Sequence, residues 1–257
     1  MSDVVLIENR GRVRVLTLNR PDRKNAFNDD LYDGVAEALT AAADDPQVAV
    51  VVVTGAEGAF SAGQDLGAMS DSHMNADGSP RGFVPFVDVL QAFPKPLVAA
   101  VNGVAVGVGV TMLLHCDLVL AADTARFRTP FVSLGIVTEA GSSVLFPALL
   151  GWQETARLLF TTDFVDAAEA ARIGLVWKTV PAGQLMGEVF ALADHIATMP
   201  VSILTTNKRL LVDARLDAVK AARQREESAL AVVAGGPAVQ EAVRAFMEKR
   251  APDFSNL

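Results

Sequence analysis

The sequence predicts a single α/β domain followed by a helical region, and three observations support this fold class. The chain has 257 residues, which is long enough to bury one full hydrophobic core. In its earlier part, short β-branched or apolar runs of strand length alternate with helical patterns. From residue 142 onward the pattern is mostly helical, with prolines and glycines as breaks.

The N-terminal part of the chain predicts a β-hairpin, a loop and a helix. Two short runs of strand composition are separated by turn residues, which is a hairpin signal. Asn28 or Asp29 can cap the helix that follows the polar loop. In order, these elements are strands at 4–8 and 13–18, a loop at 19–28 and a helix that ends near residue 43.

Two further strands are each followed by a glycine-rich turn. Residues 48–54 and 97–101 are β-branched or apolar at nearly every position, which predicts strands buried on both faces. The stretch 68–81 has no hydrophobic period and predicts a mobile surface segment. The remaining elements that we expect are a glycine-rich loop at 55–67, a helix at 85–92, a helix starting near Gly107, strands at 117–122 and 125–128, and helices at 216–234 and 237–249.

Composition and charge argue against several classes of protein. The net charge is −8 and there is no basic run, so we expect no nucleic-acid partner. The apolar runs are far shorter than the ~20 residues of a membrane span, and no signal peptide precedes them, so we expect no membrane and a cytoplasmic location. The single cysteine, Cys116, fits a reducing compartment. His73, His115 and His195 lack metal-ligand spacing, so we expect no metal site.

Two glycine-rich turns are candidates for an oxyanion hole. One is Phe-Ser-Ala-Gly-Gln-Asp-Leu at 60–66, and the other is Asn-Gly-Val-Ala-Val-Gly-Val-Gly at 102–109. Small residues let the backbone approach a ligand, and the N–H groups at a helix start have no intrahelical partner. Either turn alone is more often only a turn, but two side by side would direct two N–H donors at one oxygen. No G-x-S-x-G motif provides a serine nucleophile.

These turns resemble motifs of the crotonase (enoyl-CoA hydratase/isomerase) superfamily. With Leu-Asn-Arg-Pro at 18–21, they match the family in order and spacing, and the resemblance covers nearly the whole chain. It implies a crotonase-like spiral of ββα units, with the acyl-CoA site in 1–200. It further implies that 201–257 form a helical trimerisation region that packs on the core or on a neighbouring subunit. The implied partner is an acyl-CoA, the implied assembly a homotrimer or a dimer of trimers, and no cofactor is implied beyond the CoA of the substrate.

The resemblance also implies roles for individual residues. The N–H groups of Ala62 and Val108 would bind the thioester oxygen, and Lys24 would be available to the CoA phosphates. The residues implied to bind the substrate are Lys24, Ala26, Ala62, Gly63, Gln64, Asp65, Leu66, Val108 and Phe131.

The acid and base groups decide which reaction the resemblance implies. Hydratases of the family bind a water between two glutamates, and Thr111 and Phe131 stand at those two positions. Neither residue can act as an acid or base near neutral pH. Glu139 stands where Δ3,Δ2-enoyl-CoA isomerases carry their catalytic glutamate, and where similar epoxyphenylacetyl-CoA isomerases carry an aspartate. Alternatively, Glu139 only stabilises the first turn of a helix, an effect of ~0.3–1 kcal/mol.

The predicted function is therefore an acyl-CoA isomerase that moves a 3-enoyl double bond to the 2-position, with Glu139 as the proton shuttle. Burial among apolar neighbours should raise the pKa of Glu139 toward neutrality. Two alternatives stay open at this point. The chain is otherwise an enoyl-CoA hydratase, or an enzyme of another crotonase-type reaction, or it is a catalytically silent acyl-CoA binding subunit.

Overall fold

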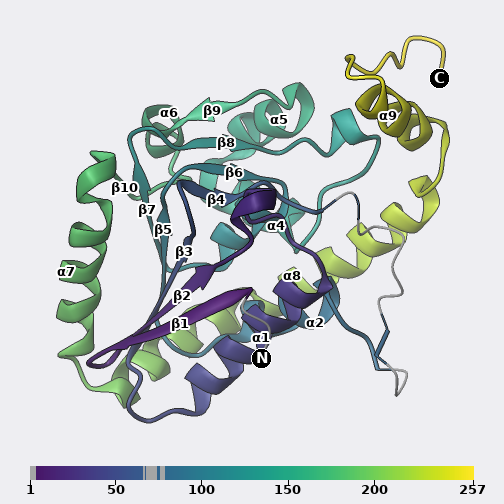
Figure 1. Cartoon of the computed structure of the whole chain (residues 1–257). Coiled ribbons are helices and arrows are strands. Elements are labelled where there is room, and N and C mark those ends of the chain that lie inside the picture. Colours follow the sequence, from purple (N-terminus) through teal and green to yellow (C-terminus); the bar gives the residue numbers. More distant parts are fainter. Residues whose placement is uncertain (1–3, 66, 68–73, 76–78) are drawn as a thin grey trace.

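The computed structural model describes residues 4–65, 67, 74–75 and 79–257, which form two β-sheets surrounded by helices (Figure 1). The strands are β1 (Val5–Arg10), β2 (Val13–Leu18), β3 (Val50–Gly55), β4 (Ala59–Ser61), β5 (Leu97–Val101), β6 (Val104–Val106), β7 (Leu118–Ala122), β8 (Arg126–Arg128), β9 (Val165–Asp166) and β10 (Lys178–Val180). The α-helices are α1 (Asp29–Asp44), α2 (Phe83–Ala92), α3 (Val108–Thr111), α4 (Ser142–Leu150), α5 (Trp152–Thr161), α6 (Ala167–Arg172), α7 (Leu185–Ala197), α8 (Val201–Val233) and α9 (Pro237–Met247).

The larger sheet has the strand order β1-β2-β3-β5-β7-β10, and the smaller has the order β4-β6-β8-β9. In the larger sheet only the β1–β2 hairpin is antiparallel, and the other pairs are parallel. In the smaller sheet β4, β6 and β8 are parallel to one another. This mixed α/β architecture confirms the predicted fold class. The parallel β4–β6 pair brings together the two turns that follow these strands.

The central strands are buried on both faces, as their apolar runs predict. Side chains of β3 alternate between two layers of core. Val51 and Val53 pack in the layer that contains α1 and α2, whereas Val50 and Val52 pack in the layer that contains α7 (Figure 1). Burying one valine side chain typically contributes about 1.5–3 kcal/mol, so this alternation strongly favours the observed register.

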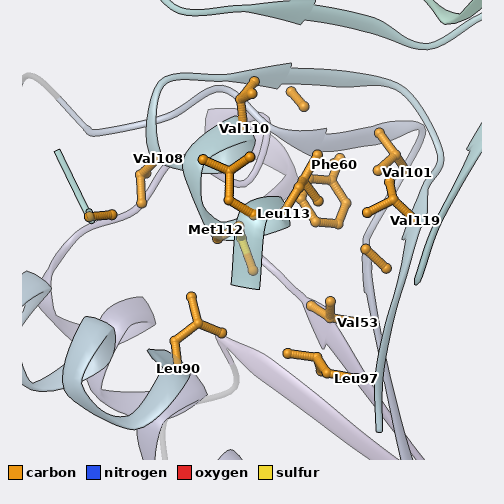
Figure 2. Close-up of a cluster of buried hydrophobic side chains, with 14 of the residues drawn as sticks. Val53, Phe60, Leu90, Leu97, Val101, Val108, Val110, Met112, Leu113 and Val119 are labelled. Atoms are coloured by element: carbon orange, nitrogen blue, oxygen red, sulfur yellow. The ribbon is translucent and has the colours of Figure 1, made fainter. Parts of the chain in front are cut away.

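The short helix α3 sits inside the first of these core layers (Figure 2). Val108 and Val110 of this helix, and Met112 and Leu113 just after it, point into the apolar layer, and each is at most 2% exposed. The surrounding side chains shown with them in the figure come from β3, β4, β5, β7 and α2, and they include Val53, Phe60, Leu90, Leu97, Val101 and Val119. Interior packing at this density holds the backbone at the start of α3 in one position.

The structure corrects several predicted elements. The expected loop at 55–67 contains β4, and the region expected to be mostly helical contains β9 and β10. These strands have only two or three residues, too few to show a period of two. Most of the stretch 68–81, predicted to be mobile, lies outside the described residues.

The C-terminal region is dominated by α8, one continuous helix of 33 residues rather than a helix that starts at 216. No glycine or proline interrupts it, and it packs against α2 and α4 of the same chain. Within the described ranges, no single helix has both the length and the apolar character of a membrane span. Among the described helices, one bent pair, 182–197 and 201–233, which meet at 105°, passes that test jointly by length and composition.

Candidate active site

The turn after β4 is held against the loop that precedes α1 by backbone hydrogen bonds. Phe27 N donates to Gly63 O at 2.7 Å, and Asp65 N donates to Phe27 O at 2.8 Å. Ala62 N donates to Lys24 O at 2.9 Å. The Ala62 N–H is therefore already engaged, and the prediction that it binds the substrate oxygen is corrected.

Gln64 carries the N–H on this turn that remains available. No acceptor within the described part of the chain faces it, whereas its neighbours on both sides are engaged. Gly63 N donates to Ser61 Oγ at 3.1 Å, and Gly63 has a φ of +93°, a value that only glycine adopts readily. In this conformation the N–H of Gln64 makes no hydrogen bond with the described residues of the loop.

The start of α3 supplies a second available N–H group. Val108 is the first residue of α3, and its N–H has no intrahelical acceptor because helices leave their first N–H groups unpaired. Gly107, just before it, is anchored by a hydrogen bond from its N to Arg128 O at 3.0 Å. That the N–H of Val108 binds the thioester oxygen stays a prediction, and its position at the start of α3 is compatible with it.

Glycines let the two turns lie in close contact. A Cβ at Gly63 would lie 2.8 Å from Val106 O, and a Cβ at Gly109 would lie 2.9 Å from Ser61 O. Both distances are shorter than a carbon–oxygen contact allows, so only glycine fits at either position. Because of this close approach, the N–H groups of Gln64 and Val108 lie on two backbone segments that are next to each other, as an oxyanion hole requires.

Glu139 is the carboxylate that faces this region. Its side chain is partly buried, and it precedes two residues with left-handed backbone, Ala140 (φ 60°) and Gly141 (φ 75°). Burial, reinforced by the negative charge of Glu226, raises the pKa of Glu139 to about 7, while the Thr111 hydroxyl opposes this shift. A carboxyl group with this pKa can both accept and return a proton near neutral pH.

Thr111 and Phe131 are both buried, with exposures of 0% and 3%. The Thr111 hydroxyl comes from α3 and faces Glu139, yet it makes no hydrogen bond of normal geometry within the described residues. Phe131 precedes the 3-10 turn η4 (Val132–Leu134). At the two positions where the resemblance implies the acids of a hydratase, the chain therefore has a neutral hydroxyl and an aromatic ring.

Tyr32, which the sequence analysis did not single out, contacts Gln64 and is affected by the charge of Glu139. Its hydroxyl donates to Gln64 Oε1 at 2.7 Å, and its ring is buried at 1% exposure. Burial raises the pKa of Tyr32 well above the ordinary value, and the charges of Glu139 and then Asp29 add to the rise. The Tyr32 hydroxyl is thus bonded to the side chain of Gln64, and the negative charge of Glu139 acts on the same hydroxyl.

Comparison with known proteins identifies the family of the chain. The profile of the enoyl-CoA hydratase/isomerase family matches residues 8–256. The chain belongs to the enoyl-CoA hydratase/isomerase family. The family is one of enzymes that act on acyl-CoA thioesters.

Individual relatives differ in the reaction that they are named for. A probable enoyl-CoA hydratase of Mycobacterium tuberculosis is 34% identical, over 99% of this chain and 98% of its own. A 1,2-epoxyphenylacetyl-CoA isomerase of Escherichia coli is 32% identical, over 99% of both chains. The crystal structure of an enoyl-CoA hydratase/isomerase from Pseudoalteromonas atlantica is 36% identical, with a TM-score of 0.93 over 98% of this chain and 100% of its own.

The residues that the family resemblance implies for the CoA path lie around the loop before α1. Lys24 is exposed and has a left-handed backbone (φ 50°), whereas Ala26 is buried. Asp65 is engaged within the protein, since it pairs with Arg20 at 2.9 Å and accepts a hydrogen bond from Gly67 N at 3.1 Å. These bonds order the turn, while Leu66 lies outside the described residues.

Other polar groups of the family fold are structural. His115 is buried, which lowers its pKa to about 4, and its Nε2 pairs with Ala140 O at 2.9 Å. Within the described ranges no cluster of histidine, cysteine or acidic side chains is arranged to hold a metal ion. Two surface hollows, of about 330 and 400 Å³, are lined by α2 with α8 and by the C-terminal segment, away from Glu139.

Proposed function

We propose that this family member is an acyl-CoA isomerase that converts a 3-enoyl-CoA to the conjugated 2-enoyl-CoA. One observation carries the proposal: Glu139 is a partly buried carboxylate with its pKa raised to about 7, and it faces Thr111 rather than a second carboxylate at that position. The carboxylate of Glu226, whose charge acts on Glu139, accepts hydrogen bonds from the backbone N–H groups of Gly141 and Ser143. This arrangement suits a reaction in which the carboxylate of Glu139 alone moves a proton from one substrate carbon to another.

The proposed reaction has two proton transfers. Glu139 removes a proton from C2 of the substrate, and the electron pair moves onto the thioester oxygen to form a dienolate. The N–H groups of Gln64 and Val108 stabilise this oxygen as its charge develops, and each such donor typically contributes about 3–4 kcal/mol. Glu139 then returns the same proton to C4, which places the double bond between C2 and C3. The atoms balance without another reactant, and CoA enters only as part of the substrate.

Hydration is the alternative that the names of several relatives favour. Adding water to a 2-enoyl-CoA requires one group to deprotonate the water and one to protonate C2. Thr111 cannot supply either function, and Phe131 has no titratable group. Glu139 alone would have to do both in turn, so we expect hydration to be slow.

The test is to assay the purified protein on a panel of 3-enoyl-CoA and 2-enoyl-CoA esters of different chain length. We expect isomerisation of the 3-enoyl esters to exceed hydration of the 2-enoyl esters, and Glu139→Gln to reduce it by about 10²–10⁴-fold. Glu227→Gln, on the exposed face of α8, is a matched control and should leave turnover unchanged.

Two results would contradict the proposal. Rapid hydration of crotonyl-CoA without isomerisation of any 3-enoyl ester would identify a hydratase that uses Glu139 alone. Tight binding of acyl-CoA without turnover of any ester would instead identify a binding subunit. Either outcome leaves the family membership unchanged.

A further inference from the structure

Glu226 is a buried carboxylate from the C-terminal helix that reaches the segment carrying Glu139. It lies on α8 and is 7% exposed. Its Oε2 accepts a hydrogen bond from Gly141 N at 2.7 Å, and its Oε1 accepts one from Ser143 N at 2.8 Å. A side chain that is more than eighty residues away in the chain therefore caps the N-terminus of α4, where Gly141 has no side chain to do so.

The geometry at Gly141 makes this contact specific. A Cβ at Gly141 would lie 2.8 Å from Val219 Cγ1, so α8 packs directly on the backbone there. Ala140 also has left-handed backbone, which costs a non-glycine residue of the order of 1–3 kcal/mol. Contacts from outside must hold this strained turn. The Glu226 carboxylate and His115, which pairs with Ala140 O, are two that the structure provides.

We propose that Glu226 is a positioning residue for the catalytic base: by capping α4 it fixes the turn at Ala140 and Gly141 and so directs the Glu139 carboxylate at the substrate. The inference rests on the proposed role of Glu139. Glu226 itself need not touch the substrate, because both its oxygens are used by the backbone.

The same placement gives Glu226 an electrostatic effect on Glu139. Its negative charge disfavours ionisation of Glu139, in addition to the larger effect of burial. Arg223, a basic side chain of α8 that approaches Gly141, is 2.6 Å from Asp88 and 3.9 Å from Glu227. Its charge is thus shared with these exposed carboxylates.

The other groups that face Glu139 do not replace this effect. Tyr32 from α1 and His115 from the 3-10 turn η3 (Met112–His115) are uncharged near neutral pH, because burial raises the pKa of the first and lowers that of the second to about 4. Thr111 from α3 contributes a neutral hydroxyl. Removing the charge of Glu226 should therefore make Glu139 ionise at lower pH.

The experiment compares Glu226→Gln, Glu226→Asp and the exposed neighbour Glu227→Gln as the matched control. Glutamine keeps the size of the side chain but turns one acceptor into a donor that faces a backbone N–H. We expect E226Q to lower kcat by about 10–100-fold with little change in KM, because a small displacement of a catalytic group is costly. The acid limb of its pH–rate profile should move to lower pH. E227Q should match the wild type in all three quantities.

The aspartate variant separates position from charge. It keeps the negative charge but is one methylene shorter, so kcat should fall while the acid limb stays near that of the wild type. An infrared titration of the carboxyl band, taken as wild type minus Glu139→Gln, measures the pKa of Glu139 without turnover. The difference between E226Q and the double variant that also carries Glu139→Gln should give a lower pKa for Glu139.

The outcomes distinguish this inference from the proposed function. If Glu139→Gln abolishes turnover but E226Q keeps the wild-type kcat and acid limb, the role of Glu226 is refuted and the isomerase assignment stands. If Glu139→Gln is fully active, the proposed function fails first. If circular dichroism shows that E226Q is unfolded, a folded E226D with the wild-type kcat overturns the inference. Failure of both to fold, with E227Q folded, gives Glu226 a purely structural role and also overturns it.

Discussion

The Thr111 hydroxyl faces the Glu139 carboxylate but makes no hydrogen bond of normal geometry within the described part of the chain. An unsatisfied hydroxyl in a buried site is costly, typically about 1–3 kcal/mol. The hydroxyl is therefore available to the base during proton transfer, although it cannot act as an acid or base itself.

Replacing Thr111 with valine should change the pH dependence of the reaction. The hydroxyl lowers the pKa of Glu139, so its removal should raise that pKa above about 7 and move the acid limb of the pH–rate profile upward. Turnover at neutral pH should fall severalfold, because less of the base is ionised. Thr111→Ser keeps the hydroxyl and should retain the wild-type limb. An unchanged limb in T111V would exclude contact between the two groups.

Glu139→Gln should make the protein more stable at alkaline pH while it destroys activity. The folded pKa of Glu139 is about 7, above the ordinary value of about 4.3 for an unfolded chain. Its contribution to stability is therefore complete below the unfolded pKa and is lost as pH rises through the folded pKa. Above about pH 8, folding must keep a partly buried carboxylate ionised, which we expect to cost up to about 4 kcal/mol.

Thermal unfolding at two pH values measures this effect. E139Q should melt at a higher temperature than the wild type at about pH 8.5 and at nearly the same temperature at about pH 4, where both side chains are neutral. A stability difference that is equal at both pH values would mean that Glu139 is not perturbed by its surroundings. Glu188→Gln, in an exposed ion pair with Lys178, is a control for the loss of one charge.

The sequence allowed the sheet to be predicted and Glu139 to be proposed as the base because both have local signals. The valine run of β3 shows burial on both faces, and Glu139 stands in a recognisable motif beside Gly141. The role of Ala62 could not be judged in this way, because whether its N–H is free depends on the carbonyl of Lys24, which approaches only in the folded chain. Glu226 was missed for the same reason: on a long charged helix it resembles its exposed neighbours, and only tertiary packing shows that it caps α4.

Gly109→Ala should separate the two turns of the oxyanion hole. The added Cβ would lie 2.9 Å from Ser61 O, so either α3 or the turn after β4 has to move by a few tenths of an ångström. Because the N–H of Val108 is directly adjacent, we expect kcat to fall by about 10–100-fold, somewhat less than for the loss of a donor. Gly187→Ala on α7 is the matched control, since its Cβ meets no atom within 4 Å. Wild-type turnover in G109A would show that the contact with Ser61 does not set the donor geometry.

Lys24→Gln should weaken binding of the CoA nucleotide without affecting the chemical step. Lys24 is exposed beside the turn that carries Gln64, so an ion pair with a phosphate would be solvated and worth only about 0.2–1 kcal/mol. We therefore expect KM for acyl-CoA to rise about 2–5-fold, with kcat unchanged, and the effect to diminish at high salt. The control is a shortened acyl-pantetheine substrate, which lacks the nucleotide phosphates and should be converted equally by both proteins. A change in KM for the shortened substrate would mean that the substitution alters the loop through the Lys24 carbonyl, which holds Ala62, rather than through a phosphate contact.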